Sequence, residues 1–488
     1  MRAKMPSLKQ TEGTAVTTLS TSVVAVAAPG NARPLDALAE VFVHLGDLAN
    51  VNTNQILIVS GRLDPSLLEQ SVQRAVAQIP LLRTRPAGSA LHEHDSSSAR
   101  WVEHREYLND CDFGDPGFRH LLMDFSSARR LNWRDRPPLQ LLLVTGGQNS
   151  CVYLSSHHGV ADARSDCLLL RSIIDHYACL TGVPGAFVLT GILPFSPLTE
   201  IRPQWYRPLE RSLRWARALG SVAVDLLRHD VGLRVGLHGQ RWEGRAKDPT
   251  IGRLDFFQSL LPQDLERRLC AAARDSGVTV NTLLCAALAR LMESSKKGTG
   301  SRRTLRITCA VSLRRLIDHS YDRSFRNYLV PSNIRLKVGQ ATPALVRSVH
   351  DAIDAARSER QIGTALGRLE SLLPLLRPRL LRGLSRRLLN RCQGTNACYS
   401  NPGRIEEDFS SFGSPQHTTQ SYVGFGCLVP PYDFILYTPT VNGRMQLDLV
   451  YRRAAFSDIR QEFTTPFLSA LRQLLDELEA PCAKLPPL

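Results

Sequence analysis

Short apolar runs alternate with longer segments of helical apolar spacing along most of the chain. The run at 54–60 predicts a strand. The runs at 139–145 and 151–156 predict the two strands of a hairpin, because a Gly-Gly-Gln-Asn turn separates them. Helical spacing returns at 165–180, directly after a pair of histidines, so these histidines are expected between a strand and a helix.

The same patterns recur over the rest of the chain and indicate a mixed fold. Asp64 and Pro65 are typical of a helix start, and apolar residues continue that helix to about residue 78. Because strands and helices mix throughout, the sequence predicts an α/β (α+β) fold of two sheet-containing lobes. Further helices are predicted at 209–228, 263–274, 280–294, 342–358 and 457–478, and further strands at 304–312, 328–336, 434–437 and 445–451.

Length and proline content predict how the 488 residues are divided. A chain of this length is too long for a single compact core, so two lobes are expected. Residues 1–33 are predicted to be a flexible tail. Five prolines between 184 and 208 mark residues 183–250 as a connection that contains one basic helix. The remaining segments, 34–182 and 251–488, are the predicted N-terminal and C-terminal lobes.

The chain carries a net charge of +15, with a pI of about 9.6. This charge predicts an acidic partner: a nucleic acid, a membrane face, a phosphorylated cofactor or an acidic protein. The sequence contains no glycine-rich phosphate loop, zinc-finger pattern or aromatic–basic RNA motif, so a nucleic acid is not expected. No apolar run approaches the length of a membrane span, so no transmembrane segment is expected.

Eleven cysteines are scattered along the chain without a Cys-x-x-Cys pair. This arrangement fits no zinc site and is typical of reduced, buried thiols in a cytoplasmic protein. His92 and His94 are followed by Asp95 in a serine-rich segment, which we interpret as a solvent-exposed loop. No metal site is therefore predicted.

The candidate chemistry lies in the run His157-His158-Gly159-Val160-Ala161-Asp162. A strand end is a rigid mount, and an imidazole there can face a cleft and move a proton near neutral pH. Gly159 permits backbone geometry that a side chain would block, and Asp162 could hold the loop through an ion pair. A lone histidine at a strand end is usually a polar cap, but two histidines with an aspartate at this spacing are rare by chance. Adjacent strand residues face opposite sides, which disfavours a shared metal ion.

This run resembles the His-His-x-x-x-Asp-Gly signature of the condensation domains of nonribosomal peptide synthetases and of related acyltransferases. The relatives include polyketide-associated acyltransferases, wax ester synthases and the plant acyl-CoA-dependent family. The resemblance extends over roughly residues 36–480. Its supporting segments are Gly61-Arg62-Leu63-Asp64, Pro80-Leu81-Leu82-Arg83, Pro137-Pro138-Leu139, Val311-Ser312-Leu313-Arg314, Asn327 and Ser400-Asn401-Pro402-Gly403.

Two positions depart from the family pattern. The final glycine of the signature is Ala163 here, and a small alanine is tolerated there unless the position needs a positive φ angle. The Asp-Phe-Gly-Trp-Gly motif of the plant family is reduced to Asp433-Phe434 followed by Ile435. This second departure disfavours a plant-type enzyme and leaves Asp433 without an assigned role.

The resemblance implies two chloramphenicol acetyltransferase-like lobes that form a V with a central tunnel. It further implies that His158 is the catalytic base, which takes a proton from an alcohol or amine acceptor as that acceptor attacks an acyl thioester. His157 and Gly159 are then supporting residues. By the same resemblance, Asp162 forms an ion pair with Arg314 that holds the loop and joins the lobes.

The resemblance also implies a pantetheine thioester donor, carried by an acidic acyl or peptidyl carrier protein or by coenzyme A, and no permanently bound cofactor. Ser400 and Asn401 are candidate oxyanion or substrate contacts. A segment rich in arginine could bind either donor, and its arginines are at 377, 379, 382, 386, 387 and 391. Two alternatives to donor binding are a solvated basic face and a contact with anionic lipid. Pro374 and Pro378 interrupt an amphipathic helix in this segment and therefore disfavour the lipid contact.

The chain contains no recognisable adenylation or carrier segment, so we expect a freestanding, monomeric condensation enzyme. Its expected reaction forms an ester or an amide in secondary metabolism. Two alternatives stay open: an acyl-coenzyme A-dependent O-acyltransferase, and a catalytically silent binding module of the same fold. Turnover of substrate would indicate an enzyme, whereas an intact tunnel without turnover would indicate a binding module.

Overall fold

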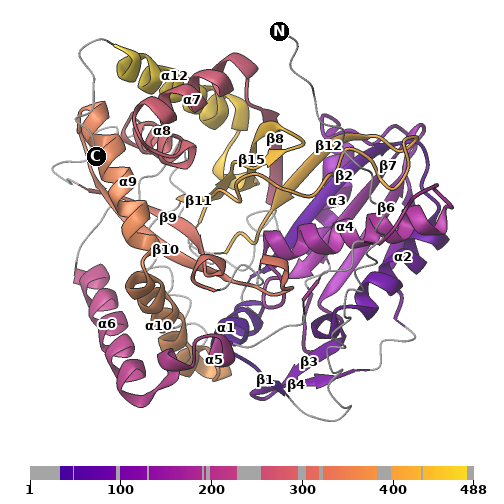
Figure 1. The fold of residues 1–488 in the computed structure, drawn as a ribbon, viewed down its shortest axis with the longest axis horizontal. Helices are drawn as coiled ribbons and strands as arrows, with labels where there is room; N and C mark the ends of the chain where they lie inside the picture. The colour runs from indigo at the N-terminus through magenta and orange to yellow at the C-terminus, as the bar shows by residue number, and fades with distance from the viewer. Residues whose placement is uncertain are drawn as a thin grey trace, which may run out of the picture.

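The structure is a computed structural model in which two lobes, each built on its own β-sheet, stand side by side (Figure 1). Residues 1–32 of the predicted tail, residues 228–250 of the predicted connection and the arginines at 382, 386, 387 and 391 lie outside the described residues. The structure describes residues 33–480 apart from 48, 95–98, 129–130, 189–191, 194–197, 228–253, 295–303, 318–321, 382–383, 385–396 and 430–431.

A five-stranded sheet forms the N-terminal lobe, in the order β12-β2-β7-β6-β5. The predicted hairpin is confirmed, since β6 and β7 pair in antiparallel fashion around the Gly-Gly-Gln-Asn turn. The predicted strand at 54–60 is the central part of β2. The strands are β2 (Asn52–Ser60), β5 (Val102–Glu106), β6 (Leu139–Thr145), β7 (Asn149–His157) and β12 (Thr419–Phe425).

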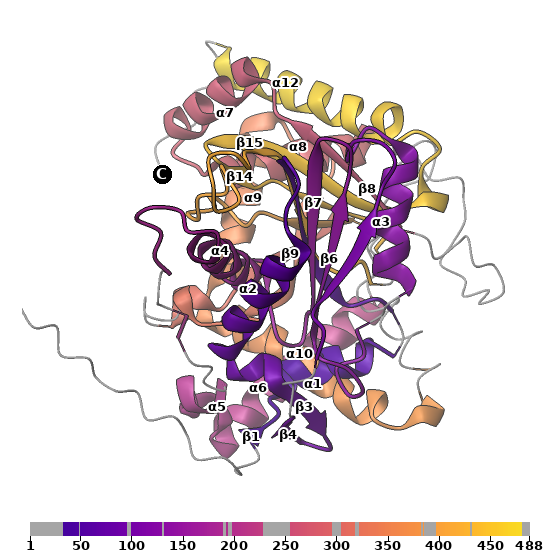
Figure 2. The same cartoon turned by 90° about the vertical axis from the view of Figure 1, so that its right-hand side faces the viewer.

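Both faces of this sheet are buried, because its central strands are nearly continuous apolar runs. On β2, Leu57 and Val59 pack in one core with α2 (Pro65–Ala77) and α4 (Ala163–Leu180). Ile56 and Ile58 point the other way and pack in a second core with α3 (Pro116–Ala128). Figure 2 shows the sheet between these helices, with α2 and α4 on one side and α3 on the other.

A seven-stranded sheet forms the C-terminal lobe, in the order β10-β9-β11-β13-β15-β14, with β8 pairing with β15. It packs in one core with α7 (Gln263–Asp275), α8 (Val280–Ser294), α9 (Thr342–Arg357) and α12 (Thr465–Glu479). The strands are β8 (Leu254–Leu260), β9 (Thr304–Ser312), β10 (Leu329–Lys337), β11 (Ala397–Ser400), β13 (Phe434–Tyr437), β14 (Thr440–Val441) and β15 (Arg444–Arg452).

Each lobe contains one element from the other half of the chain. The predicted division into lobes at 34–182 and 251–488 did not include this feature. Strand β12 comes from the C-terminal segment, yet it pairs with β2 at the edge of the N-terminal sheet. Helix α1 (Ala37–Leu45) comes from the N-terminal segment, yet its Leu38 and Val41 lie in the core of the C-terminal lobe. Each lobe is therefore completed by a piece of the other half of the chain.

Several elements were not predicted. Pro374 was expected to interrupt a helix, but helix α10 (Glu359–Leu376) continues through this proline near its end. It packs against α1 and against α6 (Pro208–Leu227), which contains the predicted basic helix. His92 lies on an exposed short strand instead of a loop. The small remaining elements are β1 (Arg33–Pro34), β3 (Thr84–Ala87), β4 (Ala90–Glu93) and α5 (Leu198–Ile201).

The sequence predicted no transmembrane segment, and it predicted reduced, buried thiols. In the part of the chain that the structure describes, no helix combines the length and the apolar character needed to cross a bilayer. The cysteines of that part are free thiols, and most of them are buried.

Candidate active site

The histidine pair lies where β7 ends, and backbone hydrogen bonds fix both residues. The amide of His157 donates to the carbonyl oxygen of Pro138 at 2.8 Å, and the amide of His158 donates to that of Val51 at 2.9 Å. Both side chains are buried, but they have different neighbours. The ring of His157 packs against Trp133, whereas the ring of His158 packs against Phe42 and lines a cavity.

The hydrogen bonding of His158 determines which ring nitrogen can act as a base. Its Nδ1 lies 2.7 Å from the carbonyl oxygen of Ala161. A carbonyl oxygen only accepts, so Nδ1 carries the proton and Nε2 of the neutral ring keeps its lone pair. Burial lowers the pKa of His158 below its usual value, although the Ala161 carbonyl and the Asp162 carboxylate act in the opposite direction. The imidazole is therefore neutral near pH 7, with Nε2 able to accept a proton.

The imidazole of His157 is buried and hydrogen-bonded to the loop that follows β7. Burial, with smaller contributions from the neighbouring His158 and Arg134, lowers the pKa of His157 to about 3, so the ring stays neutral. Its Nδ1 accepts a hydrogen bond from the amide of Gly159 at 3.0 Å. A β-carbon at Gly159 would lie 2.9 Å from that Nδ1, which leaves no room for a side chain. Glycine is thus needed here for space.

Asp162 and Arg314 form the ion pair that the resemblance implied, and both side chains are almost fully buried. Nη2 of Arg314 lies 2.9 Å from Oδ1 of Asp162. The same carboxylate caps α4 by accepting from the Ser165 amide, and it also accepts from the Tyr328 amide at 3.1 Å. Burial raises the pKa of Asp162, but Arg314 and these amides outweigh it, so the pKa lies below its usual value. The pair joins the loop after β7 to the C-terminal lobe.

A buried hydroxyl chain lies behind the histidines and was not predicted. Oγ1 of Thr53 lies 2.7 Å from Oγ of Ser156, which in turn lies 2.5 Å from Oδ1 of Asp166. Burial raises the pKa of Asp166 to about 7, although the hydrogen bonds from Ser156 and Thr53 favour the charged form. Because Thr53 also lines the cavity at His158, the chain runs from this cavity to a buried carboxyl group.

A cavity of about 130 Å³ surrounds the ring of His158, and we call it the central cavity. Both halves of the chain line it, with Phe42 and Thr53 from one half and Tyr422 and Leu329 from the other. Its lining is mainly apolar, so it suits an acyl chain better than a charged group.

Two larger cavities adjoin the central cavity and share lining residues with it. One has a volume of about 370 Å³, shares Leu329 and Ser400 with the central cavity, and contains both acidic and basic side chains; we call it the mixed-charge cavity. The other has a volume of about 430 Å³, shares Pro331 and has arginines in its lining, such as Arg217; we call it the arginine cavity. The central cavity thus adjoins two polar spaces.

The remaining predicted residues fall into different environments. Ser400 ends β11 and lines the central cavity together with His158. Asn401 lines the mixed-charge cavity instead, and its Oδ1 accepts from the Gly403 amide at 2.7 Å. Ala163 is the first residue of α4 and has no positive φ angle, so alanine causes no backbone strain there. Asp433 is buried in an ion pair with Arg452.

The arginine-rich segment contributes little to the site as far as it is described. Nε of Arg377 lies 2.7 Å from Oε1 of Glu40, so this exposed arginine joins the end of α10 to α1. Burial raises the pKa of Glu40, but its hydrogen bonds with His44 and Arg377 bring it down to about 2. The side chain of Arg379 lies outside the described part of the structure. Arg377 is therefore a structural residue.

Among the described residues, no cluster of three or more His, Cys, Asp or Glu side chains could hold a metal ion.

Asn327 contacts the histidine loop directly, since its Nδ2 donates to the backbone oxygen of His158. No sequence pattern indicated Phe42, Thr53 or Asp166, because these residues reach the site only through the tertiary structure.

No family model matches the sequence, and no curated protein matches it. Solved structures match over most of the chain. The first condensation domain of the CDA synthetase has a TM-score of 0.64 at 18% identity, over 94% of this chain and 98% of that one. A variant of the starter condensation domain of rhizomide synthetase RzmA in complex with C8-CoA has a TM-score of 0.62 at 13% identity, over 93% and 96%. The X-domain from teicoplanin biosynthesis, solved in complex with OxyB, has a TM-score of 0.60 at 16% identity, over 94% and 96%.

At these identities the comparisons establish the fold. The chain has the chloramphenicol acetyltransferase-like fold of condensation domains, and this confirms the predicted fold class. Its histidine pair lies at the end of a strand, between the two lobes of that fold.

Proposed function

We propose that the protein is an acyltransferase that moves an acyl group from a pantetheine thioester on a carrier protein to an alcohol or an amine. The observation that carries this proposal is the state of His158. Its Nδ1 is held by the Ala161 carbonyl, and the ring lines a cavity bounded by both lobes. A neutral imidazole with a fixed tautomer in a mainly apolar cavity is suited to general base catalysis. The fold of condensation domains supports the same reaction class.

In the proposed reaction, Nε2 of His158 takes the proton of the acceptor as the acceptor oxygen or nitrogen attacks the thioester carbonyl. The new bond to the carbonyl carbon gives a tetrahedral intermediate. This intermediate collapses as the carbon–sulfur bond breaks, and the leaving thiolate takes the proton back from the imidazolium. The products are an ester or amide and a free pantetheine thiol, and no acyl-enzyme is formed. Holding both substrates against one base supplies much of the acceleration.

The two adjoining cavities share different lining residues with the central cavity, which supports separate routes for the donor and the acceptor. Ser400 is the candidate oxyanion contact because it lines the central cavity, whereas Asn401 lies further away in the mixed-charge cavity and is bonded to Gly403. The ion pair of Asp162 with Arg314 positions the loop and takes no part in proton transfer.

Two observations favour alternatives that a test must separate. A domain of the same fold was solved with C8-CoA, which favours coenzyme A as the donor carrier. Another was solved in complex with OxyB, which favours a binding module. The arrangement of His158 argues for catalysis, because a binding module has no need of a base with a fixed tautomer.

Intact-mass detection of acyl transfer tests the proposal. The purified protein is incubated with a pool of alcohols and amines, with acyl carrier protein and acyl-coenzyme A donors supplied separately. His158→Ala should abolish product formation, whereas His120→Ala, which removes a half-buried histidine on α3 away from the central cavity, should leave it unchanged. Equal activity in the wild type and His158→Ala would remove His158 from its role. Silence of the wild type with both donors would favour a binding module.

A further inference from the structure

Helix α6 turns its apolar side outward. Leu209 and Leu219 are 72% and 54% exposed, and Leu213 and Val224 are 46% and 40% exposed. Together with two exposed alanines, these residues recur at helical spacing along one side of the helix. We call this side the α6 stripe, and its members are Leu209, Leu213, Ala216, Leu219, Ala223 and Val224. A surface helix normally packs such a stripe against the core, so the arrangement of α6 is the reverse of the usual one.

The side of α6 that faces the protein carries an arginine instead of the leucines. Of the α6 side chains that the structure describes, Arg214 and Ala218 are the two that are buried. Both carboxylate oxygens of Glu370 on α10 lie within 3.0 Å of Nη2 of Arg214, and the indole of Trp215 donates to the same carboxylate at 3.2 Å. A β-carbon at Gly367 would lie 3.2 Å from the Arg214 carbonyl oxygen, so α6 and α10 pack closely. Turning the leucines inward would break this buried ion pair, which therefore keeps the α6 stripe at the surface.

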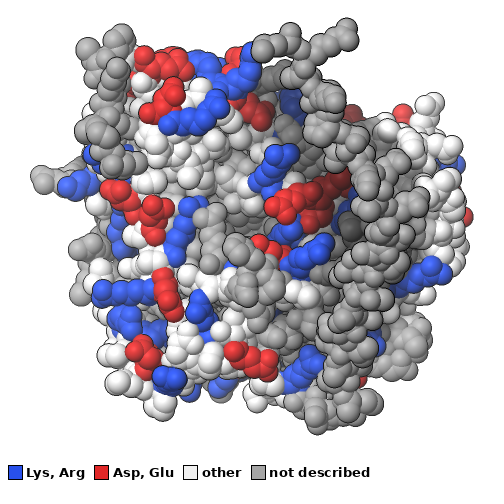
Figure 3. Space-filling view, in the orientation of Figure 1, with Lys and Arg blue, Asp and Glu red and all other residues white. Residues whose placement is uncertain are grey.

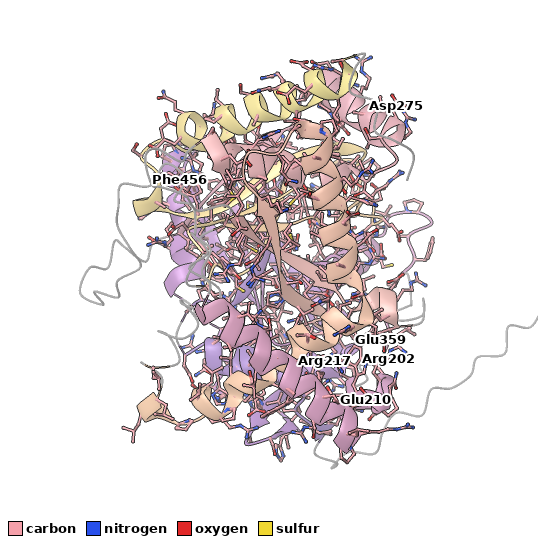
Figure 4. All side chains as sticks on the ribbon, turned by 90° about the vertical axis from the view of Figure 1, so that its left-hand side faces the viewer. Arg202, Glu210, Arg217, Asp275, Glu359 and Phe456 are labelled. Atoms are coloured by element: carbon pink, nitrogen blue, oxygen red, sulfur yellow. The ribbon has the colours of Figure 1, made fainter. Side chains whose placement is uncertain are left out.

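Basic side chains flank the α6 stripe. Arg207 and Arg211 are exposed at the start of the helix, and Figure 4 shows Arg217 further along it, on the outside of the molecule. Nε of Arg217 donates to the carbonyl oxygen of Leu213, one turn earlier, at 3.2 Å, so this arginine lies beside the stripe. Glu210 is the one acidic residue between positions 207 and 224; it is half exposed and 3.9 Å from Arg217, so water screens this contact. Figure 3 shows Lys and Arg side chains, with some acidic ones among them, at the lower left, where Figure 1 draws α6 and its neighbours.

The shape and the composition of the α6 stripe favour a lipid surface over a protein partner. The stripe is a ridge on a single helix, and the distance from Leu209 to Val224 is roughly 22 Å at the helical rise per residue. Protein interfaces depend on aromatic and arginine anchors that fill pockets, whereas this ridge contains only leucine, valine and alanine. The boundary of a bilayer accommodates an aliphatic ridge, and anionic headgroups complement the flanking arginines. The net charge of +15 acts in the same direction.

We propose that the α6 stripe docks the protein on an anionic lipid surface. The leucines enter the outer part of the acyl-chain layer, and Arg207, Arg211 and Arg217 contact the headgroup phosphates. The helix lies in the plane of the surface and does not cross it. The residues that line the central cavity include none of the stripe and none of these arginines, so the inference goes beyond the proposed function and does not depend on it.

Cosedimentation with lipid vesicles tests the docking. The vesicles consist of phosphatidylcholine alone, or of an equimolar mixture of phosphatidylcholine and the anionic phosphatidylglycerol. Leu213→Gln and Leu219→Gln, singly and together, remove apolar surface without changing the charge, whereas Arg207→Gln combined with Arg211→Gln removes charge. Leu108→Gln is the matched control, because Leu108 is a fully exposed leucine outside α6. Circular dichroism and thermal melting check the folding of each variant.

The wild type should bind the mixed vesicles more tightly than the neutral ones, and added salt should weaken this binding. Each leucine variant should lower the partition coefficient about tenfold, because one aliphatic side chain no longer leaves water. The arginine double variant should lose about tenfold or more on the mixed vesicles and nothing on the neutral ones. Leu108→Gln should behave as the wild type. Hydrogen exchange in peptides from α6 should slow when mixed vesicles are added, which locates the contact.

Failure to bind the mixed vesicles, equal binding to both kinds of vesicle, or unchanged binding of the double leucine variant would overturn the proposal. Light scattering adds a further check, because a wild-type dimer that the double leucine variant dissociates would identify a second copy of the chain as the occupant and reject lipid. The acyl-transfer assay, run with water-soluble substrates, separates this inference from the proposed function. Acyl transfer without vesicle binding would keep the reaction and reject the docking surface. Vesicle binding that depends on the leucines, without acyl transfer, would keep the docking surface and reject the reaction.

Discussion

The side-chain amide of Asn327 donates a hydrogen bond to the backbone oxygen of His158 across 2.6 Å. Asn327 lies just before β10 in the C-terminal lobe, and His158 lies just after β7 in the N-terminal lobe. The amide group of Asn327 is itself oriented, because its Oδ1 accepts from the Leu329 amide at 2.8 Å. This contact between the lobes thus helps to hold the backbone of the proposed base, together with the hydrogen bond from the His158 amide to the Val51 carbonyl oxygen.

Replacement of Asn327 by alanine should impair catalysis by letting the loop of His158 shift. We expect kcat to fall by about ten- to a hundredfold with little change in KM, and the free energy of unfolding to fall by about 1–3 kcal/mol because a buried carbonyl loses its partner. Steady-state kinetics and urea unfolding measure these effects. Asn109→Ala, at an exposed position, is the control. An unchanged kcat would show that the contact does not position His158.

The pH dependence of the rate should report the protonation of His158. Because burial lowers the pKa of this imidazole, it is unprotonated and active across neutral pH and becomes protonated only in acid. The value of kcat/KM should therefore be flat near pH 7 and decline only in acid, at a pH below the usual histidine pKa of 6.5. His158→Gln should reduce kcat by about 10²–10⁴-fold and abolish this decline. A rate that rises towards acid pH would contradict a general base.

The ion pair of Asp162 with Arg314 should matter for stability because it is almost fully buried. Either single replacement, Asp162→Ala or Arg314→Ala, leaves one buried charge without its partner and should cost about 3–5 kcal/mol of unfolding free energy. The double replacement should cost clearly less than the sum of the two. The exposed pair of Arg62 with Glu106 is the control, and its removal should cost under about 1 kcal/mol. Additive losses at the buried pair would refute the coupling.

Asp166 should make stability depend on pH in the direction opposite to that of most carboxylates. Burial raises its pKa in the folded protein to about 7, so the folded state keeps a proton that the unfolded chain has already lost. Its contribution is complete below pH 4 and is lost as the pH rises to about 7. The unfolding free energy of the wild type, minus that of Asp166→Asn, should therefore decrease over this window and then level off. A difference that does not vary with pH would show that Asp166 is ionised in the folded protein.

The parts of the fold that could be predicted are those whose local pattern agrees with their tertiary role. Strands β2, β6 and β7 have long apolar runs because both faces of their sheet are buried. Strand β12 was missed because Thr419–Phe425 contains polar residues and a glycine, and it becomes a strand only by pairing with β2. Helix α10 was missed because Pro374 indicates a break, whereas the packing against α1 and α6 outweighs the lost hydrogen bond.

The residues of the candidate site likewise fall into those that the sequence could locate and those that only the tertiary structure brings together. His158, Asp162 and Arg314 could be located because a motif places two of them within one loop and the resemblance supplies the third. The hydroxyl chain from Thr53 to Asp166 has no such signature, since its members come from two strands and a helix that meet only in the fold. The arginine cavity draws on residues of α6, α9, α10 and β10, so only the arrangement of these elements in space reveals it.

The place of β12 also bears on how the protein is made. Tyr422 of β12 is hydrogen-bonded to Gln55 of β2, although 367 positions separate them in the sequence. During synthesis, the edge of β2 has no partner until this late segment has left the ribosome, so the first half of the chain waits with an open, apolar strand edge. A fragment of residues 34–182, which lacks this segment, should therefore aggregate when expressed alone. Adding a separately made peptide of residues 419–425 is the rescue that the topology suggests.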